Sequence, residues 1–414
     1  MAFMQNDEDA VNEFNQYVKP VSLWADAWKR LRKNVMAVIS LWIVGFYILI
    51  SLFSPLLQSA GILKSYTDQY IDHQNLRPSF KPAGELVIER LEARLIQLEE
   101  SIASRGATGD TSYSSGTGFD FAPAADIVFD EGDEGEYEEE AEMEESEEPA
   151  FEYTYIDSVQ EELDRTKAEI ESLRSSIHTD PIHSRVYIMG TDDLGRDMLA
   201  RTIYGGRISI MIGLVGTLTA VLIGILIGSI SGYVGGMTDN FLMRFVDIMY
   251  SLPYMLVVII IMSIAGNKGR GSIVILFVAI ALISWLTIAR VVRGQIISLK
   301  NSEFVEAARS MGAGTPRIIF RHLLPNTLGV IIVFSTLLMP SFIMQESFLS
   351  FLGLGVSAPQ ASWGTLVSEG VKGMELRAWQ LLVPAITMTV FLFCMNFLGD
   401  GLRDALDPQS KNRG

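Results

Sequence analysis

Long apolar stretches alternate with sharply polar segments along the 414-residue chain. Six of the stretches are nearly free of charge and about 20 residues long, which is the length that crosses a bilayer core of roughly 30 Å. They lie near residues 35–57, 207–232, 241–265, 273–293, 326–347 and 379–399. A soluble protein would intersperse its apolar residues, so the pattern predicts an all-α polytopic membrane protein with six transmembrane helices.

Basic residues set the expected orientation in the membrane. Four of them lie within residues 29–33, directly before the first stretch, and such residues favour the cytoplasmic side. We therefore expect a cytoplasmic N-terminal segment, 1–34, and a cytoplasmic tail, 401–414. Counting spans also places the loop at 300–325 inside. The start of the chain is too long and acidic for a cleaved signal peptide, so the first stretch is expected to stay as an anchor.

Residues 58–186 fall outside by the same count and form an insertion. Two apolar stripes with alternating spacings of three and four predict helices near 84–104 and 157–178. The stripes are Ile88, Leu91, Leu95, Leu98 and Ile102, and then Val159, Leu163, Thr166, Ile170, Leu173 and Ile177. Between them, residues 105–156 include twelve Asp or Glu in 131–148, and such density opposes a core. We expect an extracytoplasmic helical hairpin with a disordered acidic tip.

The net charge of −17 comes from this insertion, which holds 31 acidic and 10 basic residues, against 18 and 22 in the remainder. A solvated, self-repelling linker explains the acidic run better than a cation or partner site. No basic stripe points to nucleic-acid binding. Cys394 is the single cysteine, so the chain has no internal disulfide and the redox compartment stays open.

Catalytic and nucleotide-binding patterns are missing. None of the four histidines has metal-ligand spacing, and no GxxxxGK[ST] phosphate loop occurs, so we expect no catalysis, no metal and no ATP binding in this chain. The carboxylates in residues 190–197 are close enough together to suggest a metal site. Because Arg196 competes for them, a capped, salt-bridged amphipathic helix at the outer interface is the favoured interpretation.

The loop at 300–325 has helix-turn-helix chemistry. Glu303 and Glu306 begin a short helix, Gly312 breaks it, Pro316 can start the next helix, and Pro325 is expected to stop that helix before the fifth span. Such an element on the inner membrane face suits a groove in a partner protein. The alternative is an ordinary amphipathic interfacial helix.

Gln345 and Glu346 lie at the outer end of the fifth predicted span. A charge at membrane depth is costly and usually faces a water-filled cavity. These two residues are therefore candidates to line a pathway, and snorkelling of Glu346 at the outer interface is an equal alternative.

Several segments together resemble the C-type permease of the dipeptide, oligopeptide and nickel ABC importers. They are residues 22–28, 190–207, 232–236, the 300–325 loop, 349–355, 362–364 and 398–408. The resemblance runs from about 20 to 410 and excludes 58–186. It implies a type I ABC importer permease fold with a core at 187–400. The external insertion is a departure that leaves binding-protein docking open.

The resemblance implies a subunit of the bacterial inner membrane that forms half of a translocation pathway. Its implied partners are a second permease in a heterodimer, two ATPase subunits that carry ATP and Mg, and an extracytoplasmic solute-binding protein. It also implies a coupling helix that contacts the ATPase. The residues expected to couple are Glu303, Glu306, Ala307, Ala308, Arg309, Gly312 and Ala313.

Three functions remain open from the sequence. The first is a permease for peptides, and the second is a permease for nickel or another small solute. The third is a membrane-anchored scaffold or sensor whose acidic external domain is the working part.

Overall fold

The structure is a computed structural model that describes residues 23–108, 155–177, 179–265 and 271–406. Across these ranges the regular elements are helices, and β pairing is limited to two isolated bridges. The chain divides into two compact units, one formed by Lys81–Val186 and the other by the residues on either side. Residues 58–80 therefore group with the apolar helices, whereas the sequence placed the start of the insertion at residue 58.

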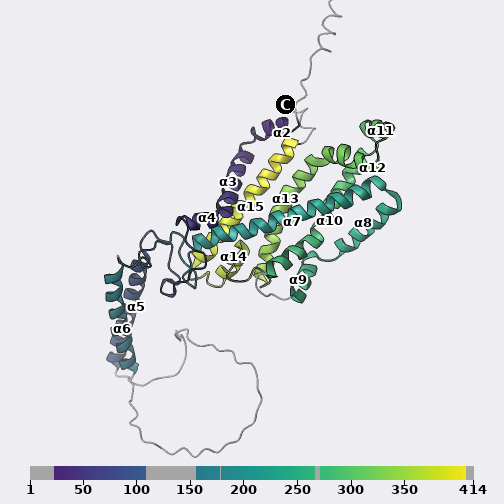
Figure 1. Ribbon diagram of the computed structural model, residues 1–414. Helices are drawn as coiled ribbons and strands as arrows, with labels where there is room; N and C mark the ends of the chain where they lie inside the picture. The colour runs from purple at the N-terminus through teal and green to yellow at the C-terminus, as the bar shows by residue number, and fades with distance from the viewer. Residues whose placement is uncertain (1–22, 109–154, 178, 266–270, 407–414) are drawn as a thin grey trace, which may run out of the picture. The chain divides into compact units, whose positions relative to one another are not determined.

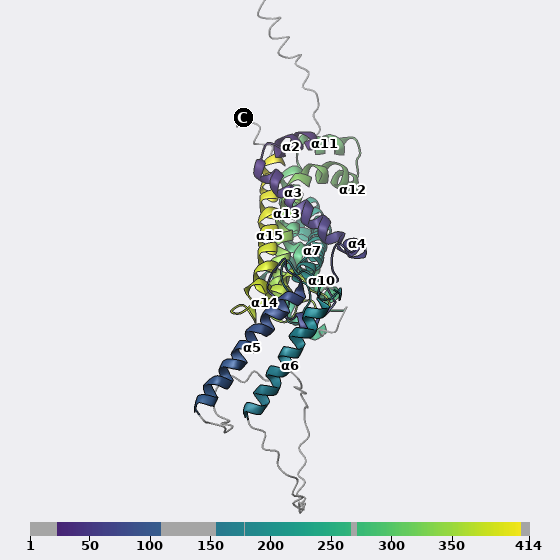
Figure 2. The ribbon, with the colours of Figure 1, turned by 90° about the vertical axis from the view of Figure 1, so that its left-hand side faces the viewer.

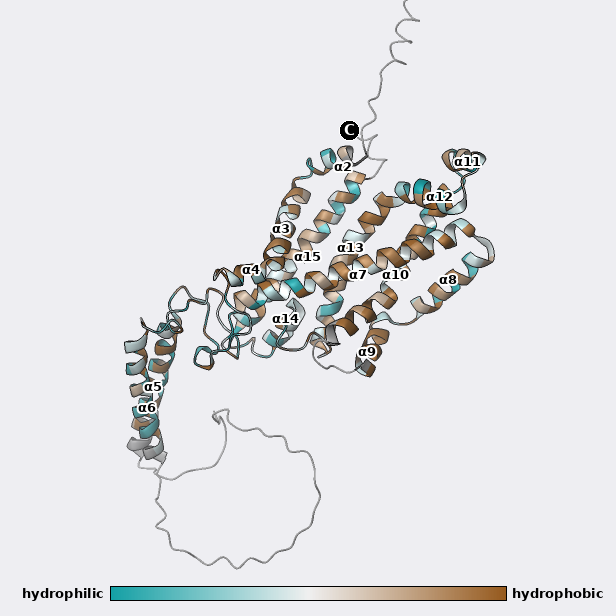
Figure 3. Ribbon diagram, viewed as in Figure 1, coloured by the Kyte–Doolittle hydropathy of each residue, from teal (hydrophilic) through white to brown (hydrophobic). Residues whose placement is uncertain are grey.

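The unit formed by the residues on either side of Lys81–Val186 is a bundle of apolar helices (Figure 1). Its elements are α2 (Leu23–Leu31), α3 (Val35–Leu52), α4 (Ser54–Ser59), η1 (Ile71–His73), α7 (Met198–Val234), α8 (Gly236–Ser251), α9 (Tyr254–Ala265), α10 (Gly271–Leu299), α11 (Glu303–Ser310), α12 (Thr315–Ile318), η2 (Ile319–Leu323), α13 (Leu324–Phe351), α14 (Trp363–Val371) and α15 (Ala378–Leu406). Brown, apolar residues dominate the long helices in Figure 3.

Five helices in the described residues are long and apolar enough to cross a membrane. They are α3, α7, α10, α15 and the continuous helix Thr315–Phe351, which contains α12, η2 and α13. The pair α8 and α9 adds a sixth if it counts as one span. The helical membrane fold predicted from the apolar pattern is confirmed, with five to six spans.

The third predicted span, 241–265, is not one straight helix. The axes of α8 and α9 differ by 79° across a break at Leu252 and Pro253. Proline has no N–H to donate and its ring clashes with the preceding turn, and the residue before it is pushed towards extended backbone. Leu252 has that conformation, with φ −79° and ψ 131°.

Two span boundaries differ from the prediction because of local chemistry. The helix α3 ends at Leu52, and a separate helix, α4, begins at Ser54 with Pro55 in its first turn. The helix α7 begins at Met198, before the predicted residue 207, because the Asp197 side chain accepts hydrogen bonds from the N–H groups of Leu199 and Ala200.

Pro325 does not stop a helix, contrary to the sequence prediction. The chain runs without interruption from Thr315 to Phe351. A π-helical turn over Ile319–Leu323 ends two residues before Pro325, which lies in the first turn of α13. This wider turn leaves room for a residue that cannot donate an N–H and whose ring would crowd a regular turn.

The helices α7 and α10 approach one another most closely through three glycines of α7. A Cβ built on Gly224, Gly228 or Gly232 would lie 2.6 Å from Ile288 Cβ, 2.5 Å from the Ala289 carbonyl oxygen or 2.9 Å from the Arg293 carbonyl oxygen. The spacing of four residues between these glycines therefore marks a helix contact, and not only the general abundance of glycine in membrane helices.

Figures 1 and 2 both place α2, α11 and the C-terminal end of α15 at one end of the bundle. At the opposite end lie α14 and the loop that precedes α7. The segment that carries the predicted coupling residues therefore lies at the same end as both termini of the described part of this bundle.

The second unit, Lys81–Val186, consists of α5 (Ala83–Thr108) and α6 (Tyr155–Ser176). Their pairing is antiparallel, since Glu92 binds Arg174 at 2.5 Å while Glu99, further along α5, binds Lys167 at 3.5 Å. Every member of the predicted α6 stripe, from Val159 to Ile177, is buried, and Ile88 is the buried member of the α5 stripe. Most of the predicted acidic tip lies outside the described residues.

Candidate functional site

The helix α11 is anchored on the bundle by two of its residues. Val305 and Ala308 are 0% and 2% exposed, and Val305 joins the apolar cluster that contains Ile318 and Leu323. Glu303 and Glu306 occupy the first turn and Arg309 the last, which matches the helix dipole at both ends. The remaining surface of this short helix points away from the bundle.

A glycine-dependent turn fixes how α11 ends. The N–H of Gly312 donates to the Arg309 carbonyl at 2.9 Å, and the N–H of Ala313 donates to the Ala308 carbonyl at 3.0 Å. These two bonds form a Schellman motif, in which the residue after the C-cap adopts a left-handed conformation. That residue is Gly312, with φ of +81°. Pro316 then begins α12, as predicted.

The predicted coupling residues separate into two groups in the structure. Glu303, Glu306, Ala307, Arg309 and Gly312 are exposed, while Ala308 is buried and Ala313 is half-buried. Ala308 therefore holds the helix in place and does not offer a contact surface.

Sequence reasoning missed two apolar residues on the exposed side of this loop. Phe304 is 40% exposed and Met311 is 81% exposed. They add apolar contact area to a surface that was described only by its charges. The helical periodicity of the sequence could have shown that Phe304 is exposed. On a helix with 3.6 residues per turn, Phe304 does not share the face of Val305 and Ala308, which point inward.

A second polar centre lies inside the bundle around Glu346, which is fully buried. Its carboxyl group accepts hydrogen bonds from the hydroxyls of Ser350 and Ser362 at 2.6 Å each, and from Ser209 at 3.5 Å. Ser362 is the N-cap of α14, and Ser209 in turn accepts from the Trp363 N–H at 3.0 Å. Glu346 thus connects α7, α13 and the start of α14.

We expect Glu346→Ala to destabilise the protein strongly. The truncation would leave buried hydroxyls without their acceptor, at a cost on the order of 1–3 kcal/mol for each unsatisfied group. Glu346→Gln keeps the shape and one carbonyl oxygen, so its thermal midpoint should fall less. Ser341→Ala, at an exposed position of the same helix, is the matched control. Equal midpoints for Glu346→Ala and Ser341→Ala in the purified complex would contradict the connecting role.

The neighbouring Gln345 has a different environment. Its side chain lines a cavity of about 380 Å³ between the α8–α9 break, α10 and α13. The two residues that the sequence analysis proposed together as pathway lining therefore have different surroundings. Gln345 faces a cavity, while Glu346 is enclosed by serines of its own chain.

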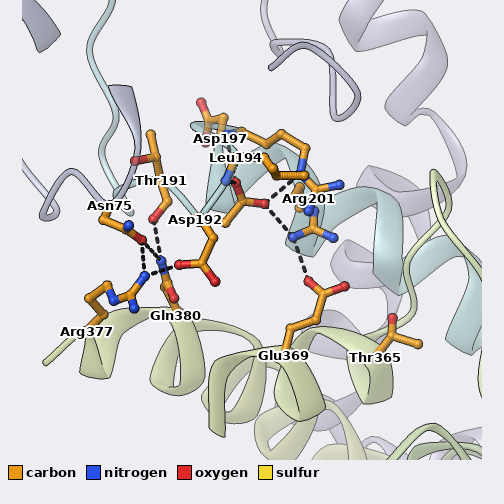
Figure 4. Close-up of polar contacts among 12 residues, drawn as sticks. Asn75, Thr191, Asp192, Leu194, Asp197, Arg201, Thr365, Glu369, Arg377 and Gln380 are labelled. Atoms are coloured by element: carbon orange, nitrogen blue, oxygen red, sulfur yellow. Dashed lines mark hydrogen bonds and ion pairs between the residues drawn. The ribbon is translucent and has the colours of Figure 1, made fainter. Parts of the chain in front are cut away.

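The carboxylates of residues 190–197 belong to a third polar cluster, shown in Figure 4. Asp192 accepts from Arg196 Nε at 2.7 Å and from an Arg201 guanidinium nitrogen at 2.6 Å. The same Arg201 nitrogen donates to Glu369 of α14 at 2.9 Å. Arginine pairing gives these acids a structural role, as the favoured interpretation held. The local structure is a turn, with Asp197 capping α7, and not the predicted amphipathic helix.

The cluster also joins segments of the bundle that are distant in the sequence. Asn75 accepts from Arg377 at 2.6 Å and from Gln380 at 2.8 Å, and Gln380 donates further to the Thr191 carbonyl at 3.1 Å. With the Thr191 hydroxyl, which donates to the His73 carbonyl and accepts from the Leu76 N–H, these bonds hold residues 73–76, 191–201 and 369–380 together. Figure 4 shows the polar contacts of this cluster.

Several membrane-spanning helices, with a short exposed helix anchored between two of them, define a polytopic membrane permease. The chain belongs to the family of binding-protein-dependent transport system inner membrane components, whose model matches residues 224–412. Residues 22–78 match the N-terminal transmembrane domain of oligopeptide transport permease C. These matches confirm the resemblance drawn from the sequence motifs. Residues 79–223, which include the Lys81–Val186 unit, lie outside both.

Similar proteins carry related names. The oligopeptide transport system permease protein OppC of Salmonella typhimurium is 53% identical over 225 residues, covering 54% of this chain and 73% of that protein. The dipeptide transport system permease protein DppC of Bacillus subtilis is 48% identical over 221 residues, covering 53% and 68%. A structure of the MetNI methionine ABC transporter has a TM-score of 0.42 at 17% identity, covering 51% of this chain and 98% of the other.

Proposed function

We propose that the chain is a permease subunit of an ABC importer that forms half of the pathway for peptides across the bacterial cytoplasmic membrane. The observation that carries the proposal is 53% identity to an oligopeptide permease over 73% of that protein's length. The dipeptide permease at 48% identity supports the same substrate class, and peptide therefore takes precedence over nickel.

The α11 loop supports a role in coupling to an ATPase. Its backbone is fixed by its own hydrogen bonds, its base is packed on the bundle, and its outer face carries Glu303, Glu306 and Arg309 beside Phe304. A preformed convex element of this kind fits a groove in a partner without further ordering. We assign the coupling role that the family resemblance implies to the segment from Glu303 to Ala313.

The remaining partners follow from the same proposal. A second permease completes the pathway, two ATPase subunits bind ATP and Mg²⁺, and an extracytoplasmic binding protein delivers the substrate. The shared end of α2, α11 and α15 supports a topology with both termini on the cytoplasmic side.

The test is transport by the complete complex in proteoliposomes, with ATP on the side of the ATPase subunits. We expect uptake of labelled oligopeptides and dipeptides from their binding protein, no uptake with ADP, and no competition from nickel chelates. An ATPase-active complex that accumulates nickel but no peptide would refute the peptide assignment.

Removing residues 106–150 in the same assay separates a permease from a scaffold. A permease should retain near-normal assembly and peptide uptake, because the deleted acidic stretch opposes a packed core. If uptake is lost while the complex assembles and hydrolyses ATP normally, then the external unit is a working part of the protein.

A further inference from the structure

The cavity beside Gln345 lies at the one sharp break among the described apolar helices. Leu252 and Pro253 at the break form one wall, Ser284 and Thr287 of α10 form a second, and Gln345 of α13 lies on a third. Residues from three separate apolar segments thus surround a space of about 380 Å³. This is at the small end of the range for ligand pockets, about 300–1,000 Å³.

The backbone groups at the helix break need either protein or water around them. Non-helical backbone is tolerated at membrane depth only where it is buried in protein or lines a water-filled cavity. The N–H groups of Leu256 and Val257 return to the Pro253 carbonyl at 3.0 and 3.3 Å, which restarts the helix on the far side of the break. The extended residue Leu252 remains at the cavity rim with 46% of its surface exposed.

Two side chains that line this cavity carry buried polar atoms for which the described residues offer no hydrogen-bond partner. They are the Oε1 atom of Gln345 and the hydroxyl of Tyr254. The Ser284 hydroxyl is the polar group beside the Tyr254 hydroxyl, and its own proton is donated to the Ile280 carbonyl. Buried polar groups are normally satisfied, so unpartnered ones at the same cavity indicate that a ligand or water completes them.

The chemistry of the two atoms is complementary to an amide. An amide oxygen such as Gln345 Oε1 accepts from an N–H, and a phenol such as Tyr254 donates to a carbonyl oxygen. Within the described part of the chain, the lining residues carry no charged side chain, and most of the remaining wall is apolar, including Leu286, Leu338 and Phe342. A neutral polar chain fits this surface better than a metal ion or a carboxylate.

Hydrogen bonds and an ion pair hold one wall of the cavity in place. The Tyr250 hydroxyl lies 3.0 Å from the Thr287 hydroxyl, which joins α8 to α10. Arg290 stacks over the Tyr250 ring at 4.1 Å and binds Asp247 at 2.7 Å. The broken helix is thereby fastened to α10 on one side of the cavity, while Gln345 approaches from α13.

We propose that this cavity binds the backbone of the transported peptide during its passage, with Gln345 accepting a peptide N–H and Tyr254 donating to a peptide carbonyl. The inference rests on the proposed peptide import. Recognition of backbone atoms by uncharged groups makes the site indifferent to substrate side chains. The cavity takes a short stretch of the peptide at a time, so the contacts are brief and local.

The experiment uses the complete complex with saturating peptide-loaded binding protein. Gln345→Leu removes the side-chain amide and Tyr254→Phe removes the phenol hydroxyl, each with little change in shape. Met344→Leu on the exposed face of α13 is the control. We expect each of the two variants to lower the maximal uptake rate by about 3- to 10-fold, as for a lost hydrogen bond. Assembly and basal ATP hydrolysis should match those of the control.

A second measurement locates the peptide directly. A photoreactive amino acid at Thr287 should crosslink to labelled peptide in complexes trapped during turnover, and the same probe at exposed Met374 should not. Peptide uptake without a Thr287 crosslink, or with rates unchanged in both variants, would overturn the backbone site and leave water as the partner of the two atoms. Absence of peptide uptake by the unmodified complex would instead refute the import function.

Discussion

Gly312→Val should abolish substrate transport while the chain still inserts into the membrane. Gly312 has φ of +81°, and a left-handed conformation costs a residue with a Cβ about 1–2 kcal/mol, with more expected for a β-branched one. No atom lies within 4 Å of the added Cβ, so the effect comes from the backbone alone. Relief of that strain breaks the Schellman motif and changes the direction of α11 on the bundle.

Gly314 provides a matched control for this variant. It is also exposed, it has no atom within 4 Å of a built Cβ, and its φ of −71° and ψ of 160° suit a β-branched residue. We therefore expect Gly314→Val to transport normally, and Gly312→Asn to recover part of the activity because asparagine tolerates left-handed backbone. The readouts are co-purification of the ATPase, substrate-stimulated hydrolysis and uptake. Wild-type values for all three in Gly312→Val would remove α11 from the coupling mechanism.

Glu306→Ala should have a much smaller effect than Gly312→Val. Glu306 is exposed, and an exposed ion pair with a partner contributes only about 0–1 kcal/mol. The comparison would separate the contribution of the backbone geometry at Gly312 from that of the charge on Glu306.

Gly228→Val should prevent the permease unit from folding. The new Cβ would lie 2.5 Å from the backbone carbonyl oxygen of Ala289, and α10 can retreat only as a whole helix. Overpacking a well-packed site costs about 1–3 kcal/mol or more, and here it also separates α7 from its main neighbour. We expect the yield of monodisperse protein in mild detergent to fall at least 10-fold.

Gly294→Val is the control for that variant. Gly294 lies on α10, and a built Cβ there meets no described atom within 4 Å beyond its own helical turn. Its yield should remain near that of the unmodified protein. If Gly228→Val and Gly294→Val are recovered equally well, then the close contact between α7 and α10 does not hold the unit together.

The sequence predicted what depends on local chemistry and on the length of apolar runs. The turn at Gly312 followed from glycine and from the proline four residues later, and the spans followed from hydropathy. The break at Pro253 could not be found in this way. Pro340 and Pro384 lie within α13 and α15 without ending either helix, so the presence of a proline does not by itself determine whether a helix breaks. The outcome depends on whether neighbouring helices satisfy the freed backbone groups.

The environment of Glu346 was equally inaccessible to sequence reasoning. An acidic residue near the end of an apolar run can line a pathway, lie at the membrane interface or be buried. Only the residues that it contacts show which of these environments it has. Two of those partners, Ser209 and Ser362, are 137 and 16 residues away in the chain. Their convergence results from the packing of α7 and α14 on α13, which no local pattern encodes. Gln345 and Glu346 differ for the same reason, since adjacent helical residues face different neighbours.

The two ends of the Lys81–Val186 unit lie next to each other. Within that unit Pro82 and Val186 form an antiparallel bridge, and in the flanking permease segment the Ser79 N–H donates to the Tyr187 carbonyl at 3.1 Å. A segment with adjacent ends can be replaced by a tight turn without moving either flank. We therefore expect that a short linker in place of the whole unit would leave the flanking segments of the membrane bundle where they are.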